Sequence, residues 1–346
     1  MSFGVITYKS DRAGRITLDR PSALHALNQR MCEDITDALI EWENDPDVEF
    51  ILVDHQKGSR GFCAGGDIAM LAASGQKDAR AAKAFFKAEY RLNNLIANYS
   101  KPYIAVMDGV TMGGGVGLAI HGSHQIATER TVFAMPETGI GLFPDAGGTW
   151  FLPRLKGELG TWLALTGEKL KGEDVLAVGL ATHFCPSENI SNIKEDLCRG
   201  GLATLVGLQT EADFSLADRL EEIDQMFAGN DVQTIRLRLR KGGRWARDQA
   251  HRIGQKSPVS TKITLRQLRT GRFLSGIQDA LQMEYRIASR LVSSADFQEG
   301  VRARLLDKDH YPHWVPSTLH STGADLVAQY FTPLESGELQ FLETGK

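Results

Sequence analysis

Three consecutive glycines, Gly113 to Gly115, interrupt an otherwise apolar stretch, TMGGGVGLAIHG at residues 111–122. Glycine loses more backbone freedom on folding than any other residue, so such a cluster indicates a place where the backbone must be bare. The glycines follow a segment typical of a buried strand, 102–110, and precede one typical of a helix. Three uses compete: a phosphate cradle, close packing of a helix on a sheet, and an oxyanion hole.

The spacing excludes the common phosphate cradles, because neither GxxxxGK[ST] nor GxGxxG is present. Close packing is the better interpretation of an isolated glycine triplet. A second glycine turn changes the balance: GFCAGGDIAML at 61–71 also follows a strand-like segment, 49–56, and also opens into a helix. We call the strand-to-helix turns within 61–71 and 111–122 the first and second glycine corners. Together they can supply the backbone N–H groups that stabilise a negatively charged oxygen in acyl chemistry.

A third segment, FAMPETGIGLFPDAGGTWFLPRL at 133–155, contains two carboxylates, Glu137 and Asp145. A single acid is usually a solvated surface residue. Both of these lie between apolar runs and glycines, where burial would raise their pKa values and suit them to proton transfer. Neither GxSxG nor HExxH occurs, and we expect His121 and His124 to be ordinary polar positions rather than zinc ligands, with no metal site.

The order of elements predicts a layered α/β fold. Residues 14–20 alternate apolar and polar side chains, which predicts a half-buried strand, and helices are expected over 26–45 and 78–99. Past about residue 200 the strand signals stop, and well-marked helices are predicted over 257–271 and 275–292.

Composition narrows the function classes. The chain has 346 residues and a net charge of −4, which argues against a protein that coats nucleic acid or an anionic membrane. A basic stretch, 236–272, could bind nucleic acid, but Trp245 is its one interleaved aromatic residue, and a solvated helix face is the better interpretation. The start lacks a signal peptide and the four cysteines form no CxxC pair, so we expect reduced thiols and a cytoplasmic protein, or a mitochondrial matrix protein if a targeting segment has been removed.

The motifs GFCAGGDI, PYIAVMDGVTMGGGVGLAIHG and FAMPETGIGLFPDAGG together resemble the crotonase (enoyl-CoA hydratase/isomerase) superfamily. Residues 85–94, 257–268 and 296–319 resemble more narrowly the branch that hydrolyses short 3-hydroxyacyl-CoA thioesters such as 3-hydroxyisobutyryl-CoA, a step of valine catabolism. The resemblance covers most of the chain. It implies an α/β fold with a crotonase-like spiral of ββα turns in residues 1–200 and an α-helical C-terminal region, 201–346, packed on it.

The resemblance also implies site residues. The backbone N–H groups of Ala64 and Gly114 would form the oxyanion hole, Glu137 would be the catalytic carboxylate, and Asp145 would act beside it. Coenzyme A would be part of the substrate, so that no separate cofactor is expected, and a homo-oligomer is left open. The residues expected to contact the substrate are Glu89, Gly65, Gly66, Asp67 and Ile68.

One departure separates hydrolysis from hydration. Hydratases of the superfamily use two glutamates to add water across a double bond, and the position that matches the first is Gly117 here. A thioester hydrolase needs an oxyanion hole, one carboxylate and a water molecule, so the resemblance favours hydrolysis. An enoyl-CoA isomerase or hydratase is the alternative, because isomerases can work with a single glutamate.

Overall fold

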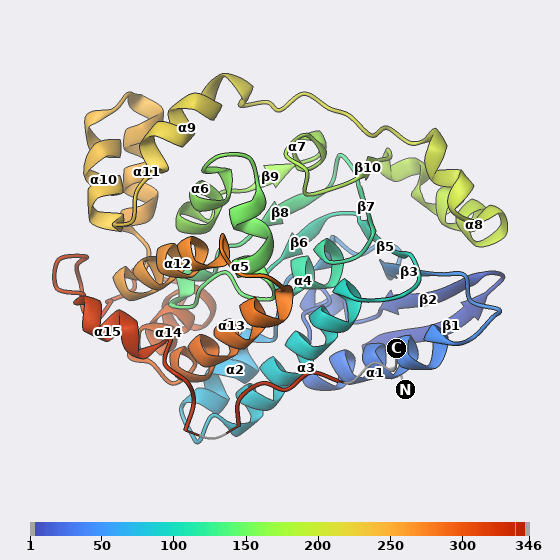
Figure 1. The fold of residues 1–346 in the computed structure, drawn as a ribbon, viewed down its shortest axis with the longest axis horizontal. Coiled ribbons are helices and arrows are strands. Elements are labelled where there is room, and N and C mark those ends of the chain that lie inside the picture. The colour runs from blue at the N-terminus through green and yellow to red at the C-terminus, as the bar shows by residue number, and fades with distance from the viewer. Residues whose placement is uncertain (1–3, 336, 343–346) are drawn as a thin grey trace.

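Two sheets lie beside the C-terminal helices, and β1 and β2 of the larger sheet reach the margin of the molecule (Figure 1). The computed structural model describes residues 4–335 and 337–342. The larger sheet has the strand order β1-β2-β3-β5-β7-β10 and the smaller one the order β4-β6-β8-β9. The strands are β1 Val5–Ser10, β2 Ala13–Leu18, β3 Phe50–His55, β4 Gly61–Cys63, β5 Tyr103–Met107, β6 Val110–Met112, β7 His124–Ala127, β8 Val132–Ala134, β9 Leu170–Lys171 and β10 His183–Phe184.

The chain repeats one local path three times. A strand of the larger sheet leads into a strand of the smaller sheet and then into a helical segment: β3-β4-α2, β5-β6-α4 and β7-β8-η2, where η2 is the 3₁₀ turn Glu137–Ile140. Strands β4, β6 and β8 pair in parallel as neighbours. Because parallel neighbours end at the same edge of a sheet, this spiral brings the three segments singled out in the sequence side by side.

Strand β2 differs from its prediction. The alternating pattern of 14–20 predicts a half-buried strand, but nearly every residue of β2 is buried. It lies between β1 and β3, and its polar side chains Arg15 and Thr17 find a partner inside the protein. Arg15 and Thr17 both donate to the buried carboxylate of Asp54, at 2.7 Å each. Because these polar side chains pair inside the protein, the alternating sequence pattern resembles that of a strand with one solvated face.

The helices carry the rest of the chain, and beyond β10 the named elements of the described chain are helical. They are α1 Gln29–Glu43, α2 Ile68–Gly75, α3 Arg80–Ala97, α4 Gly114–Ile120, α5 Gly148–Phe151, α6 Leu159–Thr166, α7 Glu173–Ala177, α8 Ile190–Gly200, α9 Leu220–Phe227, α10 Val232–Lys241, α11 Arg244–Gly254, α12 Pro258–Gly271, α13 Ile277–Leu291, α14 Ala295–Val301 and α15 Ala324–Gln329. In the part of the chain that the structure describes, no helix has the length and apolar character to cross a membrane.

Helices α12 and α13 pack on the elements around the glycine corners (Figure 1). Ser257 caps α12 as predicted, because its side chain accepts the N–H of Ser260. Gly271 is the last residue of α12, and a Cβ there would collide with the carbonyl oxygen of Thr149 in α5. This glycine therefore permits close approach of α12 and α5 as well as ending the helix.

The basic stretch 236–272 forms α10, α11 and α12. Several of its arginines donate hydrogen bonds within the protein instead of only facing solvent. Arg238 donates to the carbonyls of Gln225 and Ala228, and Arg269 donates to that of Phe227. These guanidinium groups tie α10 and α12 to the C-terminal end of α9.

Candidate active site

A cavity of about 160 Å³ lies where the two glycine corners meet the acid-bearing segment after β8. It is walled by the glycine turns after β4 and β6, by the segment after β8, and by α3. Of the residues that the sequence predicts for a site, all but Asp67 line it. The lining residues are Ala64, Gly65, Gly66, Ile68, Leu71, Phe85, Phe86, Glu89, Met112, Gly113, Gly114, Pro136, Glu137, Ile140, Leu142 and Asp145.

The triple glycine is bare because three groups approach it closely. A Cβ at residue 113 would lie 2.9 Å from Oε1 of Glu137, and a Cβ at Gly114 would collide with Oε1 of Glu89. A Cβ at Gly115 would meet the carbonyl oxygen of Cys63 on the first corner. Packing and chemistry therefore both need the glycines, because they join the two corners and leave room for two carboxylates.

The structure corrects one predicted donor. The N–H of Ala64 already donates to the carbonyl oxygen of Leu24 at 3.0 Å, so it is not free for a thioester oxygen. The N–H groups of Gly65 and Gly66 have no hydrogen-bond partner among the described residues, nor does that of Gly114, the first residue of α4. The Cβ position of Gly65 lies 3.6 Å from the nitrogen of Gly114, so the two corners present free donors next to each other.

Three carboxylates surround these donors. Glu89, Glu137 and Asp145 are all buried. Oε1 of Glu89 and Oε2 of Glu137 have no hydrogen-bond partner in the described chain. Burial raises the pKa of Glu137 well above its usual value, the charge of Asp145 adds to this, and Lys256 opposes it. Burial also raises the pKa of Glu89, and the neighbouring carboxylates add to the rise. Unpartnered acids of this kind are suited to meet a substrate or a water molecule.

Asp145 has a partner that the sequence interpretation missed. The hydroxyl of Tyr90 donates to Oδ2 of Asp145 at 2.7 Å, deep inside the protein. Burial raises the pKa of Asp145 to about 6, although the Tyr90 hydrogen bond lowers it. No local pattern of the sequence marks Tyr90, because its partner Asp145 lies 55 residues further along the chain.

Asp67 has a structural position. Its carboxylate accepts the N–H of Met70 and so caps α2, and it forms an ion pair with Arg20 at 2.8 Å. The side chain holds the first corner in place at the start of the helix. Contact of Asp67 with the substrate stays a prediction.

Gly117 leaves no room for a second glutamate on α4. A Cβ there would lie 2.8 Å from the Cβ of Ala146 and 2.9 Å from Nδ2 of Asn93. The space that a hydratase glutamate would need is filled by the Asp145 loop and α3.

Among the described residues, His121 and His124 belong to no cluster of metal-binding side chains. His121 is partly buried, and its Nε2 lies 2.8 Å from the carbonyl oxygen of Ala146, next to Asp145. His124 lies beside Ser123 at the start of β7. No group of three His, Cys, Asp or Glu side chains among the described residues is arranged to hold a metal ion.

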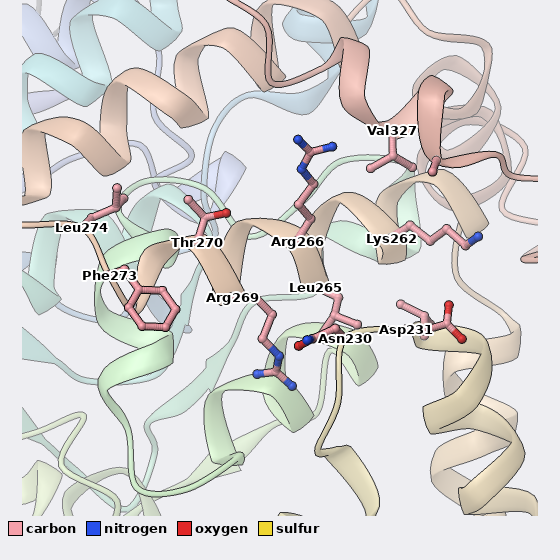
Figure 2. A pocket seen from close by; sticks show the side chains of 12 residues that line it. Asn230, Asp231, Lys262, Leu265, Arg266, Arg269, Thr270, Phe273, Leu274 and Val327 are labelled. Carbon is pink, nitrogen blue, oxygen red and sulfur yellow. The ribbon is translucent and has the colours of Figure 1, made fainter.

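A larger cavity, of about 600 Å³, lies on the outer side of α12 and carries little chemistry (Figure 2). Figure 2 shows that Lys262, Arg266 and Arg269 point in different directions rather than toward one point. Lys262 donates to the carbonyl of Thr322, and Arg266 lies over the ring of Phe331. We therefore place the site at the smaller cavity, where unpaired acids and free N–H groups converge.

Comparison with known proteins agrees with this geometry. The enoyl-CoA hydratase/isomerase family model matches residues 13–331. The mitochondrial 3-hydroxyisobutyryl-CoA hydrolase of Danio rerio is 44% identical over 97% of this chain and 91% of its own length. The human protein of that name is 41% identical over 97% of this chain and 90% of its own length.

Solved structures give the same fold. A carnitinyl-CoA dehydratase from Mycobacterium thermoresistibile has a TM-score of 0.95 at 36% identity, over 99% of this chain and 100% of that one. An enoyl-CoA hydratase from Rhodobacter sphaeroides has a TM-score of 0.90 at 39% identity, over 98% and 100%. The predicted α/β crotonase fold is confirmed, and the chain belongs to the enoyl-CoA hydratase/isomerase family.

Proposed function

We propose that this protein hydrolyses 3-hydroxyisobutyryl-CoA to 3-hydroxyisobutyrate and free CoA. The observation that carries the proposal is identity of 41–44% to 3-hydroxyisobutyryl-CoA hydrolases over 97% of the chain. The cavity supports the same chemistry, since it combines free backbone donors with buried acids.

The proposed reaction places the thioester carbonyl oxygen against the N–H groups of Gly114 and of Gly65 or Gly66. Negative charge grows on that oxygen as the carbonyl carbon is attacked, and preorganised N–H groups stabilise it. Glu137 either attacks the carbon to give an anhydride, or removes a proton from the attacking water. On either route the tetrahedral adduct breaks its C–S bond, and CoA leaves as a thiol once its sulfur has taken a proton. On the anhydride route water then hydrolyses the anhydride, which releases 3-hydroxyisobutyrate and regenerates Glu137.

Asp145 and Glu89 complete the proposed site. Asp145 either orients the water or holds the 3-hydroxyl group, because it shares the cavity with Glu137. Glu89 lies against Gly114 and is placed to contact the acyl group. Residues Gly65, Gly66 and Ile68 would lie along the pantetheine chain, on the wall that opens into α2.

Hydration or isomerisation of an enoyl-CoA is the second candidate. Two solved relatives bear the names of a dehydratase and a hydratase. The filled space at Gly117 argues against the two-glutamate reaction, although Glu89 supplies another acid from α3. We therefore place hydrolysis first.

Product analysis separates the two candidates. We would incubate the protein with 3-hydroxyisobutyryl-CoA and follow free thiol with a chromogenic reagent. In parallel, crotonyl-CoA would be followed by loss of absorbance of its conjugated double bond. Thiol release in the first reaction supports hydrolysis, whereas loss of absorbance with no thiol release moves the assignment to hydration.

The metabolic pathway and the cellular location of the reaction are also part of the proposal. Hydrolysis of 3-hydroxyisobutyryl-CoA would place this enzyme in valine breakdown. The named relatives are mitochondrial proteins, which agrees with the mitochondrial alternative and lends no support to the cytoplasmic expectation.

A further inference from the structure

Glu284 reaches from α13 into the loop that carries Asp145. Its side chain is fully buried. Its Oε2 accepts the N–H of Gly147 and its Oε1 accepts the N–H of Thr149, both at 2.8 Å. These N–H groups stand at the start of α5, which has no capping side chain of its own. A carboxylate about 135 residues further along the chain therefore satisfies them.

The loop that Glu284 holds has an unfavourable backbone. Ala146 has a φ of 51° and Gly147 a φ of 88°, both in the left-handed region. A left-handed alanine persists only where its surroundings fix it. Two more side chains do so: Nε2 of His121 lies 2.8 Å from the carbonyl oxygen of Ala146, and Gln267 donates to that of Pro144 at 2.6 Å. Asp145 is thus positioned from α4, α12 and α13 together.

The titratable groups around Glu284 are mostly acids. Asp145 and Glu89 face it as carboxyl groups, Tyr90 faces it as a phenol, and His121 stands behind the loop with a pKa that burial lowers to about 4. No cation is hydrogen-bonded to Glu284 in the described chain. Burial and the charge of Asp145 raise the pKa of Glu284 to about 8, although the hydrogen bonds from Gly147 and Thr149 lower it. Glu284 is therefore mostly protonated at the pH where Asp145, with a pKa of about 6, ionises.

We propose that Glu284 is a positioning residue, which fixes Asp145 for the reaction by holding the N–H groups of Gly147 and Thr149. The inference rests on the proposed function, since it gives Glu284 a part in that same reaction. Glu284 acts on the site through geometry, by the two hydrogen bonds that it accepts.

Two substitutions test this geometry. E284Q turns an amide NH₂ against one of the two N–H donors. E284D withdraws the carboxyl group by one methylene. We expect kcat to fall by about 100-fold in both, because a shift of about 1 Å in a catalytic group has that cost. KM should stay within about threefold, since the wall that binds CoA is unchanged.

The split between kcat and KM distinguishes positioning from a merely structural role. A structural role would raise KM or lower the folded fraction, whereas positioning lowers kcat at unchanged KM. The acid limb of kcat should stay in place in both variants, because Glu284 is mostly protonated at that pH. The matched control is E129Q, since Glu129 also accepts a loop N–H, that of Ser187 at 2.8 Å, and is not among the residues that line the cavity. It should keep kcat and the profile of wild type.

A folded E284Q with wild-type kcat overturns the inference. Where circular dichroism shows that E284Q does not fold, E284D decides: wild-type kcat in folded E284D overturns the inference, and lowered kcat at unchanged KM supports it. A wild type that releases no CoA contradicts the proposed function alone. The same variants would then be compared in hydration of crotonyl-CoA, where the same loss of kcat supports the inference and its absence overturns it.

Discussion

Oε1 of Glu89 occupies the space where a Cβ of residue 114 would lie. The carboxylate comes from α3 and the glycine from the start of α4, so the second corner and the acid fit only because residue 114 has no side chain. This contact links the triple glycine of the sequence to the buried acids of the cavity. It also makes Gly114 the position where the smallest substitution should have a large effect.

Gly114→Ala should abolish most of the activity. The added methyl group must displace Glu89 or Leu27, whose Cδ1 would be 3.4 Å away. We expect kcat/KM to fall by about 100-fold or more, and stability to fall by about 1–3 kcal/mol from overpacking. Steady-state kinetics and thermal unfolding measure both. Gly207→Ala is the control, because nothing lies within 4 Å of its Cβ position, and a result equal to that control would contradict the account.

Tyr90→Phe should shift the pH dependence of the reaction. The Tyr90 hydroxyl lowers the pKa of Asp145, which burial raises to about 6. Without that donor the pKa rises further, by roughly one unit, so an ionised Asp145 is lost at higher pH. The acid limb of kcat should therefore move to higher pH, which a pH–rate series detects.

Tyr103→Phe is the matched control for that experiment. The hydroxyl of Tyr103 is buried without a partner among the described residues and lies outside the cavity lining. Its removal should leave the pH–rate profile unchanged. An equal shift in both variants would show that the Tyr90 hydrogen bond does not tune Asp145.

Lys256→Met should stabilise the protein below pH 8. Burial lowers the pKa of Lys256 from 10.5 to about 8, so the fold disfavours its ammonium form. In wild type this penalty is absent above pH 10.5, where the amine is neutral in both states, and it grows as the pH falls to about 8. The variant lacks the penalty, so its advantage should be largest below pH 8 and vanish near pH 10.5.

Urea unfolding of both proteins at several pH values measures this difference. Lys57→Met, at an exposed position, serves as the control and should show no such trend. A constant difference between Lys256→Met and wild type across the range would contradict the predicted burial of the ammonium group.

Much of the fold and site could be predicted from local patterns. The glycine corners and the acid-bearing segment follow neighbouring parallel strands, and their motifs resemble a known family closely enough to bring Glu89, Glu137 and Asp145 together. The donor at Ala64 was wrong because hydrogen bonding by its N–H depends on Leu24, which no local pattern reveals. Tyr90 and Glu284 were missed because their partners are distant in sequence. The half-buried strand was wrong because Arg15 pairs inside the protein.

The central claim is that Glu137 drives thioester hydrolysis in this cavity. The most direct test is release of free CoA thiol from 3-hydroxyisobutyryl-CoA by wild type, Glu137→Gln and the control Glu129→Gln. The account predicts rapid release by wild type and the control, and release slowed at least about 1,000-fold in Glu137→Gln, which lacks the base or nucleophile. Release by Glu137→Gln at the wild-type rate, or none by wild type, would contradict it.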